Sequence, residues 1–235
     1  MLSHLRWFSL TRARIGRATI KLEQRAKIVR SFLLDRIVEP IVDEHKRNEM
    51  NTGIPEAELE LLKYPTGKFA RGTKAETPER VASCVAIIED FPRKLQSALH
   101  GLDDVQLDTP YRPGGWTVRQ LVHHIADSHG QSMHRFKLAL TEDKPVIKPY
   151  LEAKWAEHID ARTMPVEPSL QIISGSHARW VVLMRGMSSK DFQRVFFHPE
   201  QQREISLAEA LELYVWHSGH HLAHIENLRT RLASE

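Results

Sequence analysis

The C-terminal part of the chain contains the stretch Trp216-His217-Ser218-Gly219-His220-His221-Leu222-Ala223-His224, in which four of the eight positions 217–224 are histidines. Neighbours on a helix are three and four residues apart, so His217 and His221 lie one turn apart on one face, and so do His220 and His224. Two imidazoles at this spacing can hold one divalent ion if a third ligand comes from elsewhere. The stretch therefore predicts a helix that carries part of a metal site.

A second group of histidines, on another helical pattern, lies upstream and comprises His123, His124, His129 and His134. Two clusters on two helices predict a helical bundle with a histidine-built metal site between them. The ordinary alternative for each of these residues is a hydrogen-bonded core histidine or a solvated surface histidine.

The apolar residues of the last helix indicate which of its histidines face inward. At about 100° per residue, His217 and His221 fall on the flank of the apolar stripe, whereas His220 and His224 turn further toward solvent. A ligand pair must face the bundle interior or a cleft, which favours His217 and His221. On the upstream helix the same projection does not single out one histidine.

The composition is that of a globular protein rather than a disordered one. The 235 residues are 41% hydrophobic and 27% charged. No apolar run approaches the length of a membrane span, so we expect no transmembrane helix and no membrane partner. The single cysteine, Cys84, excludes an intramolecular disulfide and a CxxC motif. A metal site in this chain must therefore use nitrogen and oxygen ligands.

Positive charge is concentrated in the N-terminal extension, residues 1–49, which holds 11 Lys and Arg against 6 Asp and Glu. Residues 50–235 hold 22 against 24, which gives no support to a nucleic-acid partner. The first 22 residues contain no acidic residue and are typical of a mitochondrial presequence, an accessory amphipathic helix or an over-long start ahead of Met50. We expect a cytoplasmic protein, or a mitochondrial one if residues 1–22 are a genuine presequence.

Helix start and stop signals are clear in the rest of the chain. Thr77-Pro78 places an N-cap before a proline at the first helical position, and Gly101 follows the end of the same helix. Pro92 inside that helix predicts a kink. Ser206 and Glu209 have the spacing of a capping box. Together with the apolar stripes, these signals predict four long helices over about 77–100, 117–141, 169–187 and 206–232.

A long, proline-containing crossover, 143–168, separates the second and third of these helices, and we expect a short helix in it around 151–158. Four helices with one long crossover make an all-α four-helix bundle, and the cores of such bundles commonly hold metal sites. Residues 1–49 would then be a helical N-terminal extension.

From Tyr64 to the end, 64–235, the chain resembles the YfiT-type branch of the DinB-like metalloenzymes, which includes thiol S-transferases and proteins named metal-dependent hydrolases. The matching segments follow in the family's order: Leu107-Asp108-Thr109-Pro110-Tyr111-Arg112, Gly114-Gly115-Trp116-Thr117-Val118-Arg119-Gln120, His123-His124-Ile125-Ala126-Asp127-Ser128-His129, Phe136-Lys137-Leu138, Tyr214-Val215-Trp216-His217, His220-His221 and Ala223-His224-Ile225.

The resemblance implies a DinB-like four-helix bundle, often dimeric, with one zinc or nickel ion. Its metal triad corresponds to His124, His217 and His221 in this sequence. The helical projection favours the last two independently, whereas the choice of His124 rests on the resemblance. Residues 1–49 have no counterpart in the family pattern.

Three neutral imidazoles leave coordination positions open, as in catalytic metal sites. A bound water can become hydroxide near neutral pH, and a bound low-molecular-weight thiol can be held as thiolate. We therefore expect an enzyme that activates a small thiol for transfer or water for hydrolysis of a small-molecule substrate. A non-catalytic metal-binding stress protein is the other alternative.

Other residues are candidates for supporting roles. Asp127 could orient a ligand imidazole, and Arg112 and Arg119 could bind an anionic group unless they pair with neighbouring carboxylates. The candidate pocket aromatics, which would otherwise be core residues, are Trp116, Trp180 and Trp216. Cys84 lies among apolar residues and is expected to be an unreactive packed thiol.

Overall fold

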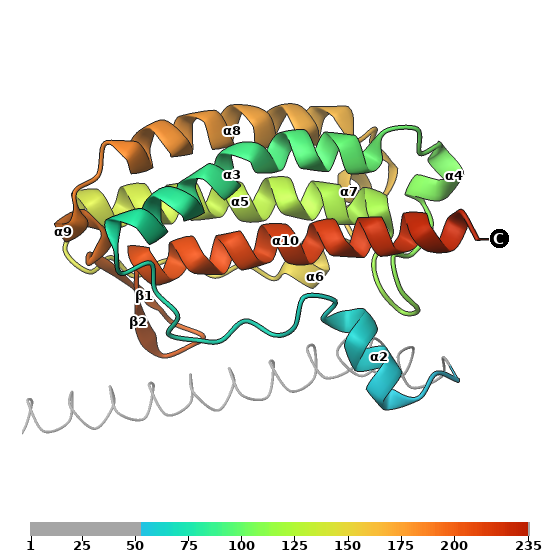
Figure 1. The fold of residues 1–235 in the computed structure, drawn as a ribbon, viewed down its shortest axis with the longest axis horizontal. Helices are drawn as coiled ribbons and strands as arrows, with labels where there is room; N and C mark the ends of the chain where they lie inside the picture. Colours follow the sequence, from blue (N-terminus) through green and yellow to red (C-terminus); the bar gives the residue numbers. More distant parts are fainter. Residues whose placement is uncertain (1–52, 235) are drawn as a thin grey trace, which may run out of the picture. The chain divides into compact units, whose positions relative to one another are not determined.

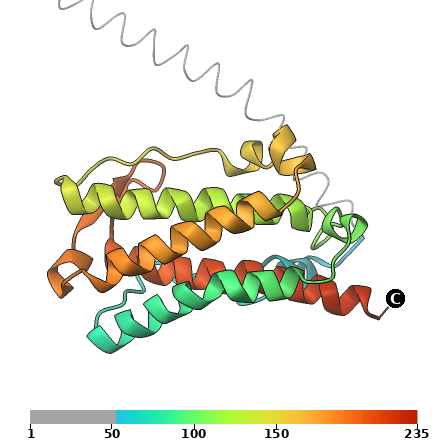
Figure 2. The same cartoon turned by 90° about the horizontal axis from the view of Figure 1, so that it is seen from above.

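A computed structural model describes residues 53–234, so the expected N-terminal extension lies outside the described residues. The four predicted long helices are present: α3 (Pro78–Leu99), α5 (Val118–Thr141), α8 (Glu167–Arg185) and α10 (Leu207–Leu232). α3 packs against α8 and α10, and α5 packs against the same two helices (Figures 1 and 2). The predicted four-helix bundle is confirmed.

Several short elements connect or flank these helices. They are α2 (Glu56–Lys63), α4 (Asp104–Leu107), α6 (Glu152–Trp155), α7 (Ile159–Thr163), α9 (Ser189–Phe192), β1 (Val195–His198) and β2 (Arg203–Ser206). The crossover thus carries two short helices, α6 and α7, where one was expected.

The two strands form an antiparallel hairpin that the sequence did not predict. The hairpin also anchors the start of the crossover, since the backbone N–H of Phe197 donates to Pro145 at 2.9 Å and that of Ile147 donates to Phe197 at 3.1 Å. The fold is therefore mostly helical, with one small sheet at the end of the bundle.

The predicted boundaries of α3 agree with its capping contacts. The side chain of Thr77 accepts a hydrogen bond from the N–H of Arg80 at 3.2 Å, and Pro78 occupies the first turn. Gly101 has φ +80°, the left-handed conformation that glycine adopts without strain just past a helix end. The helix continues through Pro92.

The predicted capping box of α10 is only half formed. The hydroxyl of Ser206 accepts from the N–H of Glu209, as expected. The Glu209 carboxylate does not return the bond, because it accepts instead from the guanidinium of Arg203 and from the N–H of Gly72 at 3.1 Å. A buried carboxylate is better compensated by a charged guanidinium than by one amide.

Two apolar clusters fill the bundle, one toward each end of the helices. The first contains Ile88 of α3, Trp180 of α8 and Leu211 of α10, all fully buried. The second contains Phe91 of α3 and Ile225 of α10. Between the two clusters lie five histidines, four buried and His217 half-buried, which we call the histidine layer: His124, His129, His177, His217 and His221.

Residues 64–75, which we call the covering segment, run along α10 (Figure 1). The N–H of Ala75 donates to Ala208 at 3.3 Å, and the indole of Trp216 donates to Gly67 at 2.9 Å. The expectation that His220 and His224 turn toward solvent was wrong, because they are only 7% and 3% exposed. Residues remote in sequence cover them: Tyr64 lies against His220, and Leu62 and Tyr111 lie against His224.

Adjacent valines on α8 provide a matched test of the core. Val181 is 3% exposed and belongs to the first apolar cluster, whereas Val182 is 71% exposed. Val181→Ala should lower the free energy of unfolding by about 1–3 kcal/mol, through lost apolar burial and the cavity left behind. Val182→Ala should change it by less than about 0.5 kcal/mol. Urea unfolding measures both, and equal losses would contradict this placement of α8.

Candidate metal centre

The three residues of the predicted triad meet between α5 and α10. His124, His217 and His221 each offer a ligand atom within 4.8 Å of the others. The Nε2 atoms of His217 and His221 are 3.0 Å apart. The ring centroid of His124 lies 5.5 Å from that of His217 and 5.1 Å from that of His221. Three imidazole nitrogens that converge in this way have the donor type and spacing of a first-row metal site.

A second group, His220, His221 and His224, also has ligand atoms within 4.8 Å of one another. All three come from α10, and His221 is shared with the first group. The Nε2 of His224 donates to the carbonyl of Leu62 at 3.2 Å, and the His220 ring stacks on Trp216 at 4.5 Å. The first group is the better candidate because it joins two helices and its paired nitrogens already converge.

Burial keeps the triad imidazoles neutral, which is the form that binds metal. It lowers the pKa of His124 to about 4, with a smaller contribution from His220. Burial also lowers the pKa of His217 and of His221 well below the ordinary value, and neighbouring imidazoles add to the effect. The triad contains no carboxylate, so an ion bound there would keep its full charge.

The other histidines of α5 have different surroundings. The Nδ1 of His123 lies 2.7 Å from the hydroxyl of Ser169 and its Nε2 lies 3.2 Å from the carbonyl of Met164, so the ring faces the crossover. His134 is exposed. His129 lies behind His217, with its Nε2 3.0 Å from the Nδ1 of His217. Of the four, His124 is the one whose ring joins the group of converging nitrogens.

Sequence reasoning missed His177 on α8, which is 1% exposed. Its Nε2 lies 2.7 Å from the Nδ1 of His129, and its Nδ1 lies 2.7 Å from the carbonyl of Ile88. Phe91 stacks against both His129 and His177, at 5.3 Å and 5.5 Å. The signal in the sequence was an isolated histidine on an apolar helix, which is ordinarily a core residue.

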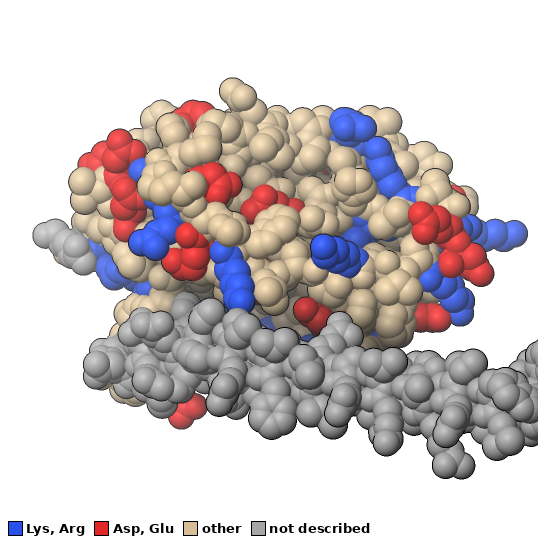
Figure 3. All heavy atoms as spheres, turned by 180° about the vertical axis from the view of Figure 1, so that it is seen from behind, with Lys and Arg blue, Asp and Glu red and all other residues tan. Residues whose placement is uncertain are grey.

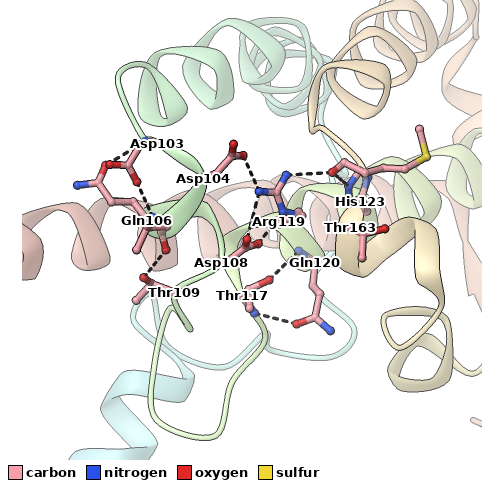
Figure 4. Close-up of polar contacts among 12 residues, drawn as sticks. Asp103, Asp104, Gln106, Asp108, Thr109, Thr117, Arg119, Gln120, His123 and Thr163 are labelled. Atoms are coloured by element: carbon pink, nitrogen blue, oxygen red, sulfur yellow. Dashed lines mark hydrogen bonds and ion pairs between the residues drawn. The ribbon is translucent and has the colours of Figure 1, made fainter.

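Arg119 is engaged in a structural contact rather than free for a substrate. Figure 4 shows its guanidinium between Asp104 and Asp108, with N–O distances of 2.8 Å and 2.6 Å, and it also donates to the carbonyl of Met164 at 3.0 Å. The alternative of pairing with neighbouring carboxylates therefore holds for this residue. Arg112 donates to the carbonyl of Pro113 at 3.0 Å.

Asp127 does not orient a triad imidazole: within residues 53–234 no hydrogen bond joins its carboxylate to one of the three ligand candidates. Burial, and to a lesser degree Asp160, raises its pKa to about 6. The position behind a ligand that was expected for Asp127 is occupied by His129, behind His217.

The three tryptophans and the cysteine have distinct positions. Trp116 packs against His124, with ring centroids 4.8 Å apart, and Trp216 stacks on His220. Trp180 is fully buried in the first apolar cluster. Burial raises the pKa of the Cys84 thiol to about 12, with Glu212 adding to the rise, so this thiol is protonated and unreactive at neutral pH.

Charge on the surface is mixed where it can be seen. On the face shown in Figure 3, basic and acidic side chains are interspersed. Within the part of the chain that the structure describes, no helix combines the length and the low polarity that crossing a membrane requires.

A four-helix bundle with three converging, neutral histidines defines a class of metal-binding helical proteins. Residues 87–225 match the DinB superfamily, and the chain belongs to this family. A protein of Bacillus cereus, provisionally named a metal-dependent hydrolase, is 50% identical over 171 residues, which are 73% of this chain and 97% of that protein. YfiT of Bacillus subtilis, with the same provisional name, is 46% identical over 171 residues, covering 73% of this chain and 96% of YfiT.

The fold agrees with a solved structure of YfiT from Bacillus subtilis. The TM-score is 0.71 at 45% sequence identity, covering 74% of this chain and 98% of that one. That structure is described as a probable metal-dependent hydrolase with an unusual four-helix bundle topology. The resemblance expected from sequence is confirmed.

The buried neutral histidines predict acid sensitivity of the metal-free protein. Histidines of the unfolded chain take up protons near pH 6.5, whereas those of the layer have lower pKa values in the folded state. The unfolded state therefore binds more protons below that pH, and stability should fall by about 1.4 kcal/mol per pH unit for each such proton. Urea unfolding at about pH 7 and 5 measures this, and equal stability at both would contradict it.

Proposed function

We propose that this protein is a metalloenzyme in which His124, His217 and His221 hold one divalent ion, zinc or nickel, that activates a small thiol for transfer to an electrophile. The observation that carries the proposal is the convergence of three neutral imidazoles, with ligand atoms within 4.8 Å, from two helices. Metal dependence agrees with the provisional names of the relatives.

The ligand set favours an anionic partner. A divalent ion bound there would lower the pKa of a thiol or water that it binds, which supplies a nucleophile at neutral pH. Because the three histidines are neutral, none of the ion's charge is cancelled by the protein ligands in this buried place. A thiolate offers both the missing negative charge and a sulfur donor that suits zinc.

The chain's own residues limit how the reaction can proceed. Cys84 is buried and protonated, so a protein thiol is not the nucleophile. Arg119 is held by Asp104 and Asp108 and does not bind substrate. Half-buried His217 and Trp116 form the more open side of the triad, and we place the incoming substrate there.

The second candidate is hydrolysis by activated water, which the provisional names of the relatives favour. It uses the same three histidines, so the residues of the triad do not distinguish it from thiol transfer. The requirement for a thiol distinguishes the two.

Alanine substitution tests the triad. His124→Ala, His217→Ala and His221→Ala should each lose most bound zinc or nickel, because two imidazoles hold a divalent ion far more weakly than three. Metal content is measured by elemental analysis, and circular dichroism checks the helical content. His134→Ala is the control, since His134 is exposed on the same helix as His124. Full metal occupancy in the His217 and His221 variants would disprove the site.

A second pair of variants tests the reaction. Cys84→Ala should retain the turnover of the metal-loaded protein, because its thiol is not part of the site, whereas His221→Ala should lose it. Turnover is followed as conjugation of a small thiol to an electrophile. Ester or amide hydrolysis in thiol-free buffer, at a rate that added thiol does not change, would favour the hydrolase. Metal binding with neither activity would favour a non-catalytic role.

A further inference from the structure

A proline on α3 leaves a backbone acceptor at the level of the histidine layer. Pro92 has no N–H, so it cannot donate to the carbonyl of Ile88 four residues earlier, as a residue in a regular helix would. The Nδ1 of His177, from α8, lies 2.7 Å from this carbonyl. The imidazole thus takes the place of the missing helical donor.

This contact fixes the direction of a chain of hydrogen bonds. A carbonyl only accepts, so the Nδ1 of His177 carries the hydrogen and, in a neutral ring, its Nε2 is an acceptor. The Nδ1 of His129, 2.7 Å away, must then donate, which makes the Nε2 of His129 an acceptor. The Nδ1 of His217, 3.0 Å from that atom, must donate in turn. The lone pair of His217 is therefore on Nε2.

The surroundings disfavour the other protonation states. His129 is fully buried among Phe91, Trp180 and Tyr214. Both of its hydrogen-bond partners are imidazoles, those of His177 and His217. An extra proton would place an uncompensated charge there. The opposite tautomers would require the carbonyl of Ile88 to donate a hydrogen, which it does not have.

We propose that His177 and His129 are positioning residues that hold His217 as the Nδ1–H tautomer and so present its Nε2 lone pair to the metal. The ligand role of His217 rests on the proposed function, whereas the tautomers follow from the hydrogen bonds alone. Ligands in metal sites commonly donate their second N–H to a carbonyl or carboxylate. Here the carbonyl of Ile88 fixes the tautomer of His217 through two intervening imidazoles, those of His177 and His129.

The hydrogen-bonded series of imidazoles also gives the two candidate ligands of α10, His217 and His221, different tautomers before metal binds. Before metal binds, the Nε2 of His221 must donate to the Nε2 of His217, 3.0 Å away, since the latter carries no hydrogen. To bind metal through Nε2, His221 must move its hydrogen to Nδ1, a buried atom without a hydrogen-bond partner in the described part of the chain. His217 is therefore preorganised, and His221 changes tautomer.

Nitrogen-15 NMR of the full chain labelled at histidine measures these tautomers directly, in zinc-free and zinc-loaded protein. His177, His129 and His217 should be Nδ1–H in both states, and His221 should change from Nε2–H to Nδ1–H on zinc addition. A zinc-free protein with His177 or His217 as the Nε2–H form would overturn the proposal. Single-histidine variants assign the signals.

Zinc affinity, measured by competition with a chromogenic chelator, provides a second readout. His177→Phe keeps a ring against Phe91 but removes both nitrogens, and should weaken zinc binding roughly 10- to 100-fold. His177→Gln should recover most of the loss, because its amide can donate to Ile88 and accept from His129. His123 is another buried histidine, but it is not part of the hydrogen-bonded series of imidazoles. The His123→Phe variant should therefore bind zinc as the wild type does.

The outcomes separate this proposal from the metal site itself. Wild-type affinity in the folded His177→Phe variant would overturn the positioning role; should that variant fail to fold, the tautomers of the wild type decide. The expected tautomers without zinc binding would reject the proposed function and leave the hydrogen-bonded chain in place. Zinc bound by the triad with the opposite tautomers would support the metal site and reject the positioning role of His177 and His129.

Discussion

The hydrogen bond between His177 and the carbonyl of Ile88 is the contact on which the centre of the bundle depends. It lies between two apolar clusters, where water is excluded and an unpaired polar group costs about 1–3 kcal/mol. In the series that runs from this carbonyl through His177, His129 and His217, each imidazole finds its hydrogen-bond partner in the group before it. All four long helices meet in this layer: α3 supplies the carbonyl, α8 supplies His177, and α5 and α10 supply the rest.

Local signals in the sequence were sufficient to predict the four long helices of the bundle. Caps such as Thr77, the glycine at 101 and the apolar stripes locate the four long helices to within about two residues, because these features act within one or two turns. The same periodicity selected His217 and His221 over the other histidines of α10. Choosing His124 required the family resemblance, since the helical projection of α5 has histidines on more than one side.

Contacts between residues far apart in sequence were not predictable in this way. His220 and His224 are buried by Tyr64, Leu62 and Tyr111, none of which is near them in the chain. His177 acquires its role only when α8 is placed beside Pro92 of α3. The hairpin β1–β2 was missed because each strand has only four residues, too few for an alternating pattern to be distinguished from a loop.

The covering segment makes the local stability around His220 and Trp216 of α10 different from that of the helical core. It contributes no helix or strand, and a few hydrogen bonds, such as those of Trp216 to Gly67 and of Ala75 to Ala208, hold it in place. Parts held in this way open at a lower free energy than the packed core around them. Its detachment would wet the rings of His220 and Trp216 while the four helices stayed packed, so that amide exchange would be faster at 64–75 than in the helices.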